Sequence, residues 1–274
     1  NLNAENGLPS NHVYGMITDR LGYLWIATDK GVVRYNGYEC KLFDMKDGLP
    51  TNDIWQLVED KTGKIWLGCS SDEIGYIESD RYHKAYFKNS DRTFSPSSIN
   101  AYDDGIMFTS RHLSGNSMPS ICIAKSDTVY KFDVTEELFN ISDTLWNIPD
   151  VFCTQVGKVF IAYKRRFFRL NNVSGICDQK TAPFVTLVED IDQKFLHHTI
   201  PEDRVFAVGN NFFSFSRHGN RSILRRLNFN NMRLDSIDIR QYGVIEPINY
   251  INYDASYSHS IGVLNVYNKR HILR

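Results

Sequence analysis

The sequence carries one pattern of about 30 residues twice, and the second copy follows the first at a fixed distance. Residues 7–35 return as residues 48–76 with no gap, an offset of 41. The residues that recur include Gly7, Pro9, Asn11, Asp19, Gly22, Trp25 and Tyr35, which return as Gly48, Pro50, Asn52, Asp60, Gly63, Trp66 and Tyr76. A fixed period of about 40 residues indicates a repeat architecture.

Each copy reads as four short strands joined by tight turns. In the first copy the predicted strands cover residues 12–18, 23–28, 32–35 and 38–43, because β-branched and aromatic residues alternate or run together there. Turn residues separate them, including Asn36-Gly37, a strong hairpin signal. Four antiparallel strands in about 40 residues is the size of one β-propeller blade. We therefore predict an all-β chain, a β-propeller of about six to seven four-stranded antiparallel blades, with ring closure left open; another stack of four-stranded sheets is the alternative.

The repeated motif resembles the two-component regulator propeller repeat. Both copies contain G-L-P-[ST]-N, a strand, D-x-x-G-x-[IL]-W-[IL], a turn and a strand ending in Tyr. One departure is Asp72-Glu73, which stands where the first copy has Gly31-Val32. The resemblance covers about the first third of the chain. It implies the periplasmic sensor part of an inner-membrane histidine kinase or hybrid two-component protein of Bacteroidetes-type bacteria, with a homodimer as the full-length receptor.

The later chain continues the strand pattern without the motif. We predict a single propeller domain over residues 1–274, with clear repeats at 7–47 and 48–87 and degenerate blades at about 99–142, 150–190, 195–229 and 234–274. Phe160 and Phe206 take the tryptophan place in the fourth and fifth blades. Residues 88–98 read as a linker and 111–120 as a loop. Residues 270–274 either add an outer strand beside the first blade or precede further parts of the ring, and we expect no helix longer than two turns.

Composition excludes several function classes. The net charge is −1 and basic residues form no long run, which disfavours nucleic-acid binding. No apolar run reaches the roughly 18 residues of a membrane span, so we expect membrane attachment only through segments outside this chain. The five cysteines are unevenly spaced, which predicts small buried side chains, although an oxidising compartment would permit one disulfide.

Candidate ligand-binding residues lie in two loops of each blade, the loop before the first strand and the loop between the second and third. These loops open on one face of a propeller, and loops on a rigid scaffold commonly carry binding sites. The candidates are Asn11, His12, Asp29, Lys30, Asn52, Asp53, Ser71, Asp72, Arg111 and His112. This polar set suits a sugar-like or other polar small molecule, or a protein. Structural roles compete with binding: Asn11 and Asn52 would bond their own loops, Asp19 and Asp60 would form turns, and Trp25 and Trp66 would pack between blades.

The sequence carries no recognisable catalytic motif. His197 and His198 are adjacent, and neighbouring residues of a strand point to opposite faces, so we predict no metal site, no cofactor and no catalytic residue. We predict a non-catalytic, extracytoplasmic ligand-sensing domain of a two-component histidine kinase. The alternatives are an extracytoplasmic propeller enzyme acting on polysaccharide and a protein-docking scaffold. Facing carboxylates or a Tyr/His pair in the central funnel would favour the enzyme.

Overall fold

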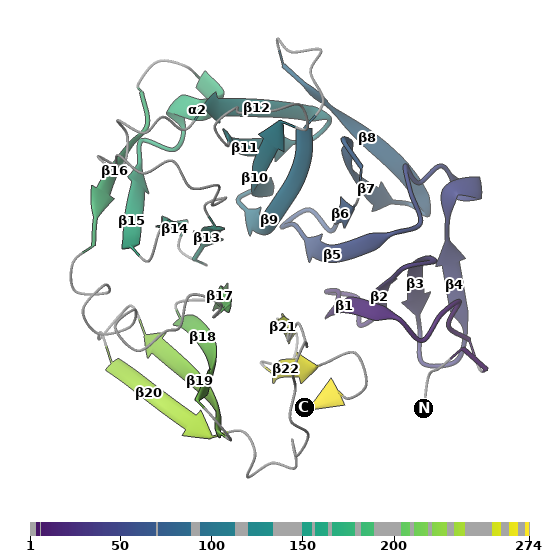
Figure 1. Cartoon of the computed structure of the whole chain (residues 1–274). Helices are drawn as coiled ribbons and strands as arrows, with labels where there is room; N and C mark the ends of the chain where they lie inside the picture. The colour runs from purple at the N-terminus through teal and green to yellow at the C-terminus, as the bar shows by residue number, and fades with distance from the viewer. Residues whose placement is uncertain are drawn as a thin grey trace. The chain divides into compact units, whose positions relative to one another are not determined.

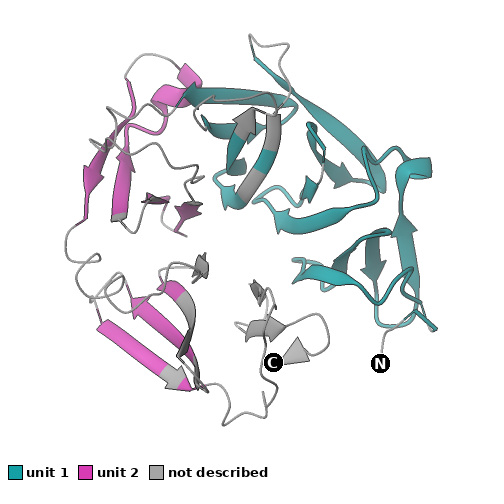
Figure 2. Cartoon of the chain, viewed as in Figure 1, with its two compact units in different colours: residues 1–134, 252–274 teal, residues 135–251 magenta. Residues whose placement is uncertain are grey.

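A computed structural model of the chain describes residues 4–5, 7–69, 71–88, 94–112, 120–133, 150–154, 157–163, 166–178, 182–188, 204–208, 211–218, 221–228, 233–238, 254–258, 263–267 and 272–273. These residues form sheets in which consecutive strands pair antiparallel, with one parallel pairing described below (Figure 1). The chain divides into two compact units, residues 1–134 with 252–274, and residues 135–251 (Figure 2). The prediction of an all-β chain built from four-stranded sheets is confirmed.

The first sheet contains the first copy of the repeat. Its strands pair antiparallel in chain order and are β1 (Val13–Thr18), β2 (Leu24–Thr28), β3 (Gly31–Tyr35) and β4 (Cys40–Phe43). Gly22 closes the β1–β2 turn with a φ of 88°, a conformation that glycine adopts at little cost. The Asn36 side-chain oxygen accepts the amides of Tyr38 (2.8 Å) and Glu39 (2.7 Å), which fixes the β3–β4 hairpin.

The second copy forms β5 (Ile54–Glu59), β6 (Ile65–Cys69), β7 (Ile74–Glu78) and β8 (Arg81–Phe87), and a short 3-10 helix, η1 (Met45–Asp47), precedes it. The offset of 41 fails after β6. Tyr35 lies opposite Leu24, whereas Tyr76 lies opposite Trp66, the counterpart of Trp25. One additional residue in the β6–β7 turn causes this shift. The predicted equivalence of the two tyrosines is therefore wrong.

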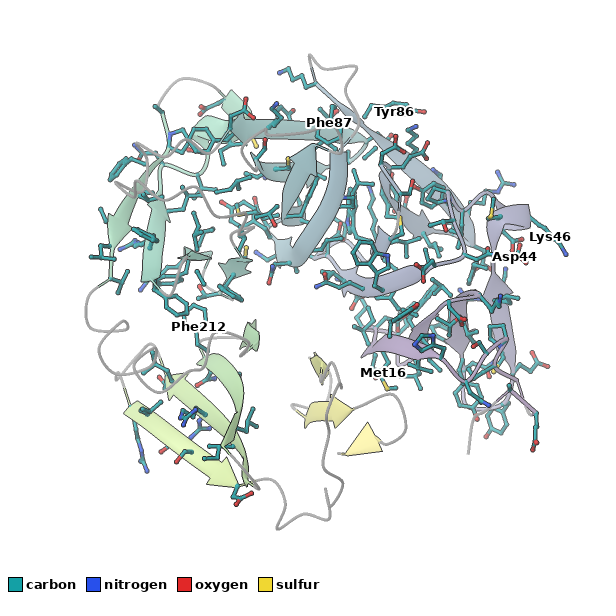
Figure 3. All side chains as sticks on the ribbon, viewed as in Figure 1. Met16, Asp44, Lys46, Tyr86, Phe87 and Phe212 are labelled. Atoms are coloured by element: carbon teal, nitrogen blue, oxygen red, sulfur yellow. The ribbon has the colours of Figure 1, made fainter. Side chains whose placement is uncertain are left out.

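A third set of four strands is joined to the second set by a parallel pairing of their outer strands. The strands are β9 (Phe94–Tyr102), β10 (Gly105–His112), β11 (Ser120–Lys125) and β12 (Thr128–Asp133). The outer strand β8 pairs with β12 in parallel, and the amides of Tyr86 and Lys88 each donate to a carbonyl of the third set at 2.8 Å. One eight-stranded sheet results. Figure 3 labels Tyr86 and Phe87 on this outer strand.

Two expectations about the third repeat are wrong in their bounds. Residues 94–98, read as linker, belong to β9, and residues 111–112, read as loop, end β10. Both segments pair with each other in register, for example Arg111 opposite Ser95, so the β9–β10 hairpin is longer than the apolar core of either strand. Polar residues at the far ends of β9 and β10 also pair with each other, so the hairpin extends beyond the apolar segments from which it was predicted.

The second unit contains two four-stranded sheets, each antiparallel and in chain order. The first consists of β13 (Asp150–Cys153), β14 (Val159–Tyr163), β15 (Arg166–Asn171) and β16 (Phe184–Leu187), with one short helix, α2 (Gly175–Asp178), between the last two. The other consists of β17 (Arg204–Val208), β18 (Asn211–His218), β19 (Arg221–Asn228) and β20 (Arg233–Asp238). Phe212, labelled in Figure 3, is fully buried against Phe152, Phe160 and Phe167. The side chain of Phe206 lies outside the described part.

The last strands are β21 (Asp254–Ser258), β22 (Val263–Tyr267) and β23 (Ile272–Leu273), which form a three-stranded sheet in the first unit. Two expectations change here. The predicted blade boundary near residue 234 falls inside β20, which pairs with β19 through contacts such as Leu234 opposite Leu227. Residues 272–273 pair with β22 rather than beside the first sheet. Among the described residues no helix exceeds two turns.

The repeat tryptophans lie between sheets. Trp25 packs with Phe43 of its own sheet and with Ile54 and Leu67 of the next, and Trp66 packs in the same way with Ile99 and Phe108. Trp66 is fully buried. Each tryptophan therefore covers the face of the following sheet, and apolar burial of this size drives the stacking.

Each tryptophan is tied to a buried aspartate in its own sheet. Trp25 Nε1 donates to Asp19 at 2.7 Å, and Trp66 Nε1 donates to Asp60 at 2.8 Å. The other carboxylate oxygen of Asp60 accepts the amides of Thr62 (2.8 Å) and Lys64 (3.1 Å) in the β5–β6 turn. The aspartate thus closes the turn and satisfies the buried indole N–H, which would otherwise lose a hydrogen bond.

The sheet formed by β13 to β16 replaces both the aspartate and the tryptophan. Thr154 stands in the aspartate place, where its hydroxyl accepts the Lys158 amide at 3.0 Å, and Phe160 stands in the tryptophan place. Gly157 keeps the turn, since its amide donates to the Thr154 carbonyl at 2.9 Å. Phenylalanine has no N–H to satisfy. The carboxylate is therefore dispensable wherever the indole is absent.

Neighbouring sheets of the first unit are also joined by polar contacts at matching places. The residue opposite the tryptophan on the third strand is Arg34 in the first sheet and Tyr76 in the second. Arg34 pairs with Asp80 in the β7–β8 turn at 2.6 Å, and the Tyr76 hydroxyl donates to Asp127 in the β11–β12 turn at 2.6 Å. Two different side chains thus hold the outer turn of the next sheet.

We expect the Asp60–Trp66 pair to show strong energetic coupling. Asp60→Thr leaves the indole N–H unpaired and Trp66→Phe leaves Asp60 Oδ2 without its donor, so each should cost about 2–3 kcal/mol of unfolding free energy. The double variant reproduces the Thr154 and Phe160 arrangement, and it should be less destabilised than the sum by about 1–2 kcal/mol. Urea unfolding followed by far-ultraviolet circular dichroism measures all three.

The matched control combines Asp60→Thr with Trp25→Phe. Trp25 bonds to Asp19 and not to Asp60, so these two changes should add within about 0.5 kcal/mol. Additivity in the Asp60–Trp66 pair as well would contradict the coupling.

Candidate functional site

The two repeats build the same loop before their first strand. The Ser10 hydroxyl accepts the His12 amide at 3.0 Å, and the Thr51 hydroxyl accepts the Asp53 amide at 3.2 Å. A hydroxyl that accepts the amide two residues later is a common turn device. The loops therefore present His12 and Asp53 at equivalent places, at the starts of β1 and β5.

The two loop asparagines hold backbone. Asn11 Oδ1 accepts the Ala4 amide at 2.8 Å, and Asn52 Oδ1 accepts the Met45 amide at 2.9 Å, in each case seven residues earlier. In the second repeat this bond ties down η1, whose cap Asp44 accepts the Lys46 amide at 2.6 Å (Figure 3). These side-chain oxygens are thus occupied by the scaffold.

A backbone hydrogen bond connects the β2–β3 turn of the first sheet with the loop before β5. The Gly31 amide donates to the Asn52 carbonyl at 2.7 Å. Gly31 has a φ of 117°, and a Cβ on it would lie 2.3 Å from the Phe43 carbonyl oxygen, so only glycine fits. This contact brings Asp29, in the same turn, toward Asp53.

Four side chains meet there, and we call His12, Tyr14, Asp29 and Asp53 the polar cluster. The His12 and Tyr14 rings are 4.6 Å apart between centroids, and His12 Nδ1 lies 3.9 Å from Asp29 Oδ2. The Asp53 and Asp29 carboxylates both lie close enough to the Tyr14 hydroxyl to raise its pKa. The His12 and Asp29 side chains are 37% and 30% exposed, so solvent reaches one side of the cluster.

Two oxygens of the polar cluster are buried without a hydrogen-bond partner, Asp29 Oδ1 and Asp53 Oδ1. Buried polar atoms in folded proteins are usually paired, and an unpaired carboxylate oxygen is costly. Two such atoms, on aspartates that both lie near Tyr14, leave the polar cluster with more hydrogen-bond acceptors than donors.

The electrostatics of the polar cluster are negative. The pKa of Tyr14 is raised to about 12, chiefly by burial and also by the neighbouring carboxylates of Asp53 and Asp29. A tyrosine with such a pKa keeps its proton at neutral pH. Tyr14 therefore acts there as a hydroxyl donor.

The other candidates do not join the polar cluster. Lys30 is exposed. Ser71 accepts the Glu73 amide at 3.2 Å and lies 3.5 Å from Asp72, within the β6–β7 turn. The side chains of Arg111 and His112 lie outside the described part of β10. Of the ten candidates, the structure brings together His12, Asp29 and Asp53, and it leaves Asn11 and Asn52 to the scaffold.

Tyr14 is the member that the sequence analysis missed. Its counterpart in the second repeat is Trp55, a large apolar side chain that is 37% exposed, whose indole N–H donates to the Asp53 carbonyl at 3.0 Å. The two repeats keep the loop residues Gly, Leu, Pro and Asn but differ at positions 12 and 53 and at 14 and 55. These differences within an otherwise matching loop are the sequence signal that could have identified Tyr14 as a site residue.

The described residues include no group of three side chains placed to hold a metal ion. All five cysteines are free thiols, of which Cys69 and Cys122 are buried. None of the described helices is both long and apolar enough to cross a membrane.

A family model described as two component regulator propeller matches residues 7–30 and 48–71. Residues 7–30 and 48–71 are thus similar to two-component regulator propeller repeats. Each matched segment ends in the turn after the second strand, and the second match stops where the offset of 41 fails. None of the curated proteins matches the chain.

Solved structures with this fold include extracellular domains of signalling proteins. The extracellular domain of the putative hybrid two component system BT4673 from B. thetaiotaomicron is 13% identical with a TM-score of 0.57, covering 94% of this chain and 34% of that one. That of BT3049 from the same organism is 12% identical with a TM-score of 0.52, covering 99% and 39%. The chain thus spans little more than a third of either domain. YCF48 bound to D1 peptide is 11% identical with a TM-score of 0.50, covering 96% and 78%.

These likenesses, at low identity, establish the fold class. The chain is a β-propeller type of all-β protein that begins with two regulator propeller repeats. The prediction of an all-β propeller fold is confirmed, and the predicted resemblance to regulator propeller repeats is confirmed for residues 7–30 and 48–71.

We expect Asp53→Asn to lower the Tyr14 pKa from about 12 toward the ordinary value of about 10, without reaching it. The substitution removes one negative charge, while burial, the largest cause of the shift, remains. Titration of ¹³C-labelled tyrosine by NMR measures the change, and Tyr14→Phe assigns the signal.

Asp104→Asn is the control for that titration. Asp104 lies in the β9–β10 turn and pairs with Lys125 at 2.8 Å, so the same loss of charge there should leave Tyr14 unchanged. An equal shift in both variants would show that the polar cluster has no special influence on Tyr14.

Proposed function

We propose that this chain is a ligand-sensing domain of a two-component signalling protein and is itself non-catalytic. The observation that carries the proposal is the pair of regulator propeller repeats, at the start of a chain whose fold resembles extracellular domains of putative hybrid two-component systems. The polar cluster, between the first two sheets, is the proposed ligand contact. In full, the protein would be an inner-membrane histidine kinase or hybrid protein with this domain in the periplasm.

The polar cluster supports binding more than catalysis. It does contain a His/Tyr pair and two carboxylates, the combination that would favour an enzyme. A tyrosine serves as a general base only if its pKa falls toward neutrality, and the pKa of Tyr14 moves the other way. Unpaired acceptors beside a raised phenol pKa suit the recognition of a donor-bearing polar ligand.

Signalling requires that the ligand discriminate between two arrangements of the receptor. A ligand with equal affinity for both shifts no equilibrium. We propose a homodimer as the signalling form, in which ligand contact at the polar cluster favours one arrangement of the two subunits. The ligand would be a polar small molecule, with a protein partner as the alternative.

We expect one chemical class of polar compound to raise the melting temperature of the chain without being consumed. A ligand at a hundred times its Kd adds about 2.7 kcal/mol of stability, which a thermal-shift screen detects readily. The panel contains mono- and oligosaccharides, amines, peptides and peptidoglycan fragments, and chromatography of each hit tests for turnover.

The control variants separate binding from stability. Asp29→Asn and Asp53→Asn should abolish the shift, whereas Asp104→Asn, outside the polar cluster, should preserve it. Turnover of the hit would replace the sensor proposal with an enzyme. A hit that binds equally well to Asp53→Asn would place the ligand elsewhere.

A further inference from the structure

The polar cluster carries an excess of hydrogen-bond acceptors and negative charge. Two aspartates each bury an oxygen without a hydrogen-bond partner, and the charges of both raise the pKa of the neighbouring Tyr14. The one basic group within ion-pair distance of either carboxylate, among the described residues, is His12 at 3.9 Å from Asp29. A ligand at this place must therefore supply hydrogen-bond donors, and a positively charged ligand is attracted most strongly by the two carboxylates.

Aromatic rings stand beside these carboxylates. The ring of Tyr14 lies against His12, and Trp55, at the equivalent place of the second repeat, is partly exposed and fixed by the bond from its indole N–H to the Asp53 carbonyl. A cation over an aromatic face is attracted by the ring quadrupole, and tryptophan gives the strongest attraction. Carboxylates with aromatic neighbours form the combination that recognises alkylammonium groups.

Other acidic side chains of the first unit have basic partners. Asp103 and Asp104 share the Lys125 ammonium, and Asp80 pairs with both Arg34 and Lys41. Lys30 is next to Asp29 in sequence, and no ion pair joins its ammonium to Asp29 or Asp53 in the described structure. In the described structure Asp29 and Asp53 thus differ from Asp80, Asp103 and Asp104 in having no Lys or Arg partner.

We propose that the polar cluster is a binding site for a ligand with a protonated amine, held by Asp29 and Asp53 and flanked by Tyr14 and Trp55. The inference rests on the sensor function proposed above and names the chemical class that this site takes. The ammonium supplies hydrogen bonds and positive charge to the partly exposed carboxylates of Asp29 and Asp53, and its alkyl part lies along the rings.

The test uses pairs of probes that differ in charge alone. Glucosamine is compared with N-acetylglucosamine, and putrescine with 1,4-butanediol, each titrated into the whole chain with ¹³C-labelled tyrosine. We expect the amine of at least one pair to shift the Tyr14 signal and to lower its pKa, because a cation offsets the carboxylate charges. The neutral partner should bind at least about tenfold more weakly.

Variants locate the effect. Asp29→Asn and Asp53→Asn should each weaken amine binding by about tenfold or more, since each removes a charge-assisted hydrogen bond. Asp104→Asn carries the same change of net charge and should bind as the unchanged chain does. Far-ultraviolet circular dichroism confirms that each variant is folded.

Three results would overturn the inference: equal binding of the neutral partner, unchanged amine binding in both polar-cluster variants, or no effect of any amine on Tyr14 up to about 10 mM, where even weak sites fill. The sensor proposal fails separately. An amine that binds at the polar cluster but leaves kinase signalling of the full-length protein unchanged would keep this site and remove its signalling role. A neutral ligand that drives signalling would support the sensor function and contradict the amine site.

Discussion

The hydrogen bond between a buried aspartate and a buried tryptophan fixes the geometry of each regular repeat. Asp19 and Asp60 hold the turn between the first two strands and at the same time receive the indole N–H of Trp25 and Trp66. The hydrogen bond places the indole ring at the same position along the second strand of each repeat, where the ring covers the next sheet. The charge is tolerated in the core because turn amides and the indole surround it. Stacking, turn shape and strand register thus depend on one carboxylate per repeat.

The contacts between sheets follow from this arrangement. Arg20, in the β1–β2 turn, pairs with Glu59 at 2.7 Å and donates to the Asp60 and Lys61 carbonyls of the next sheet. Lys61, its counterpart 41 residues later, lies 3.7 Å from Asp103 in the third. Exposed pairs of this kind contribute about 0–1 kcal/mol each, so they set alignment while the buried aromatic faces supply stability.

The repeat period predicted the strands because turn residues and alternation are local signals. It could not predict the extra residue of the β6–β7 turn, since Asp72 and Glu73 read equally well as turn or strand edge, and the register of Tyr76 depends on which they are. It placed the boundary near residue 234 too early. The apolar residues Leu234 and Ile237 are compatible with an outer strand of one sheet and equally with an inner strand of the next. The site was predictable in its loops, which brought in His12, Asp29 and Asp53. Tyr14 lay one step inside a strand, and its role depends on Asp53 from another repeat, which no local pattern shows.

The parallel pairing of β8 with β12 changes how the first unit can come apart. Successive sheets of a repeat protein usually touch through side chains alone, and each can open by itself. Here main-chain hydrogen bonds cross from one sheet to the next at Tyr86 and Lys88, so these amides are released only when both sheets separate. Native-state hydrogen exchange would register the two sheets as a single cooperative unit, while the outer strand β4 of the first sheet, which pairs only with β3, would fray independently. A displacement that begins at β5, beside the polar cluster, would accordingly be passed on by eight strands moving together.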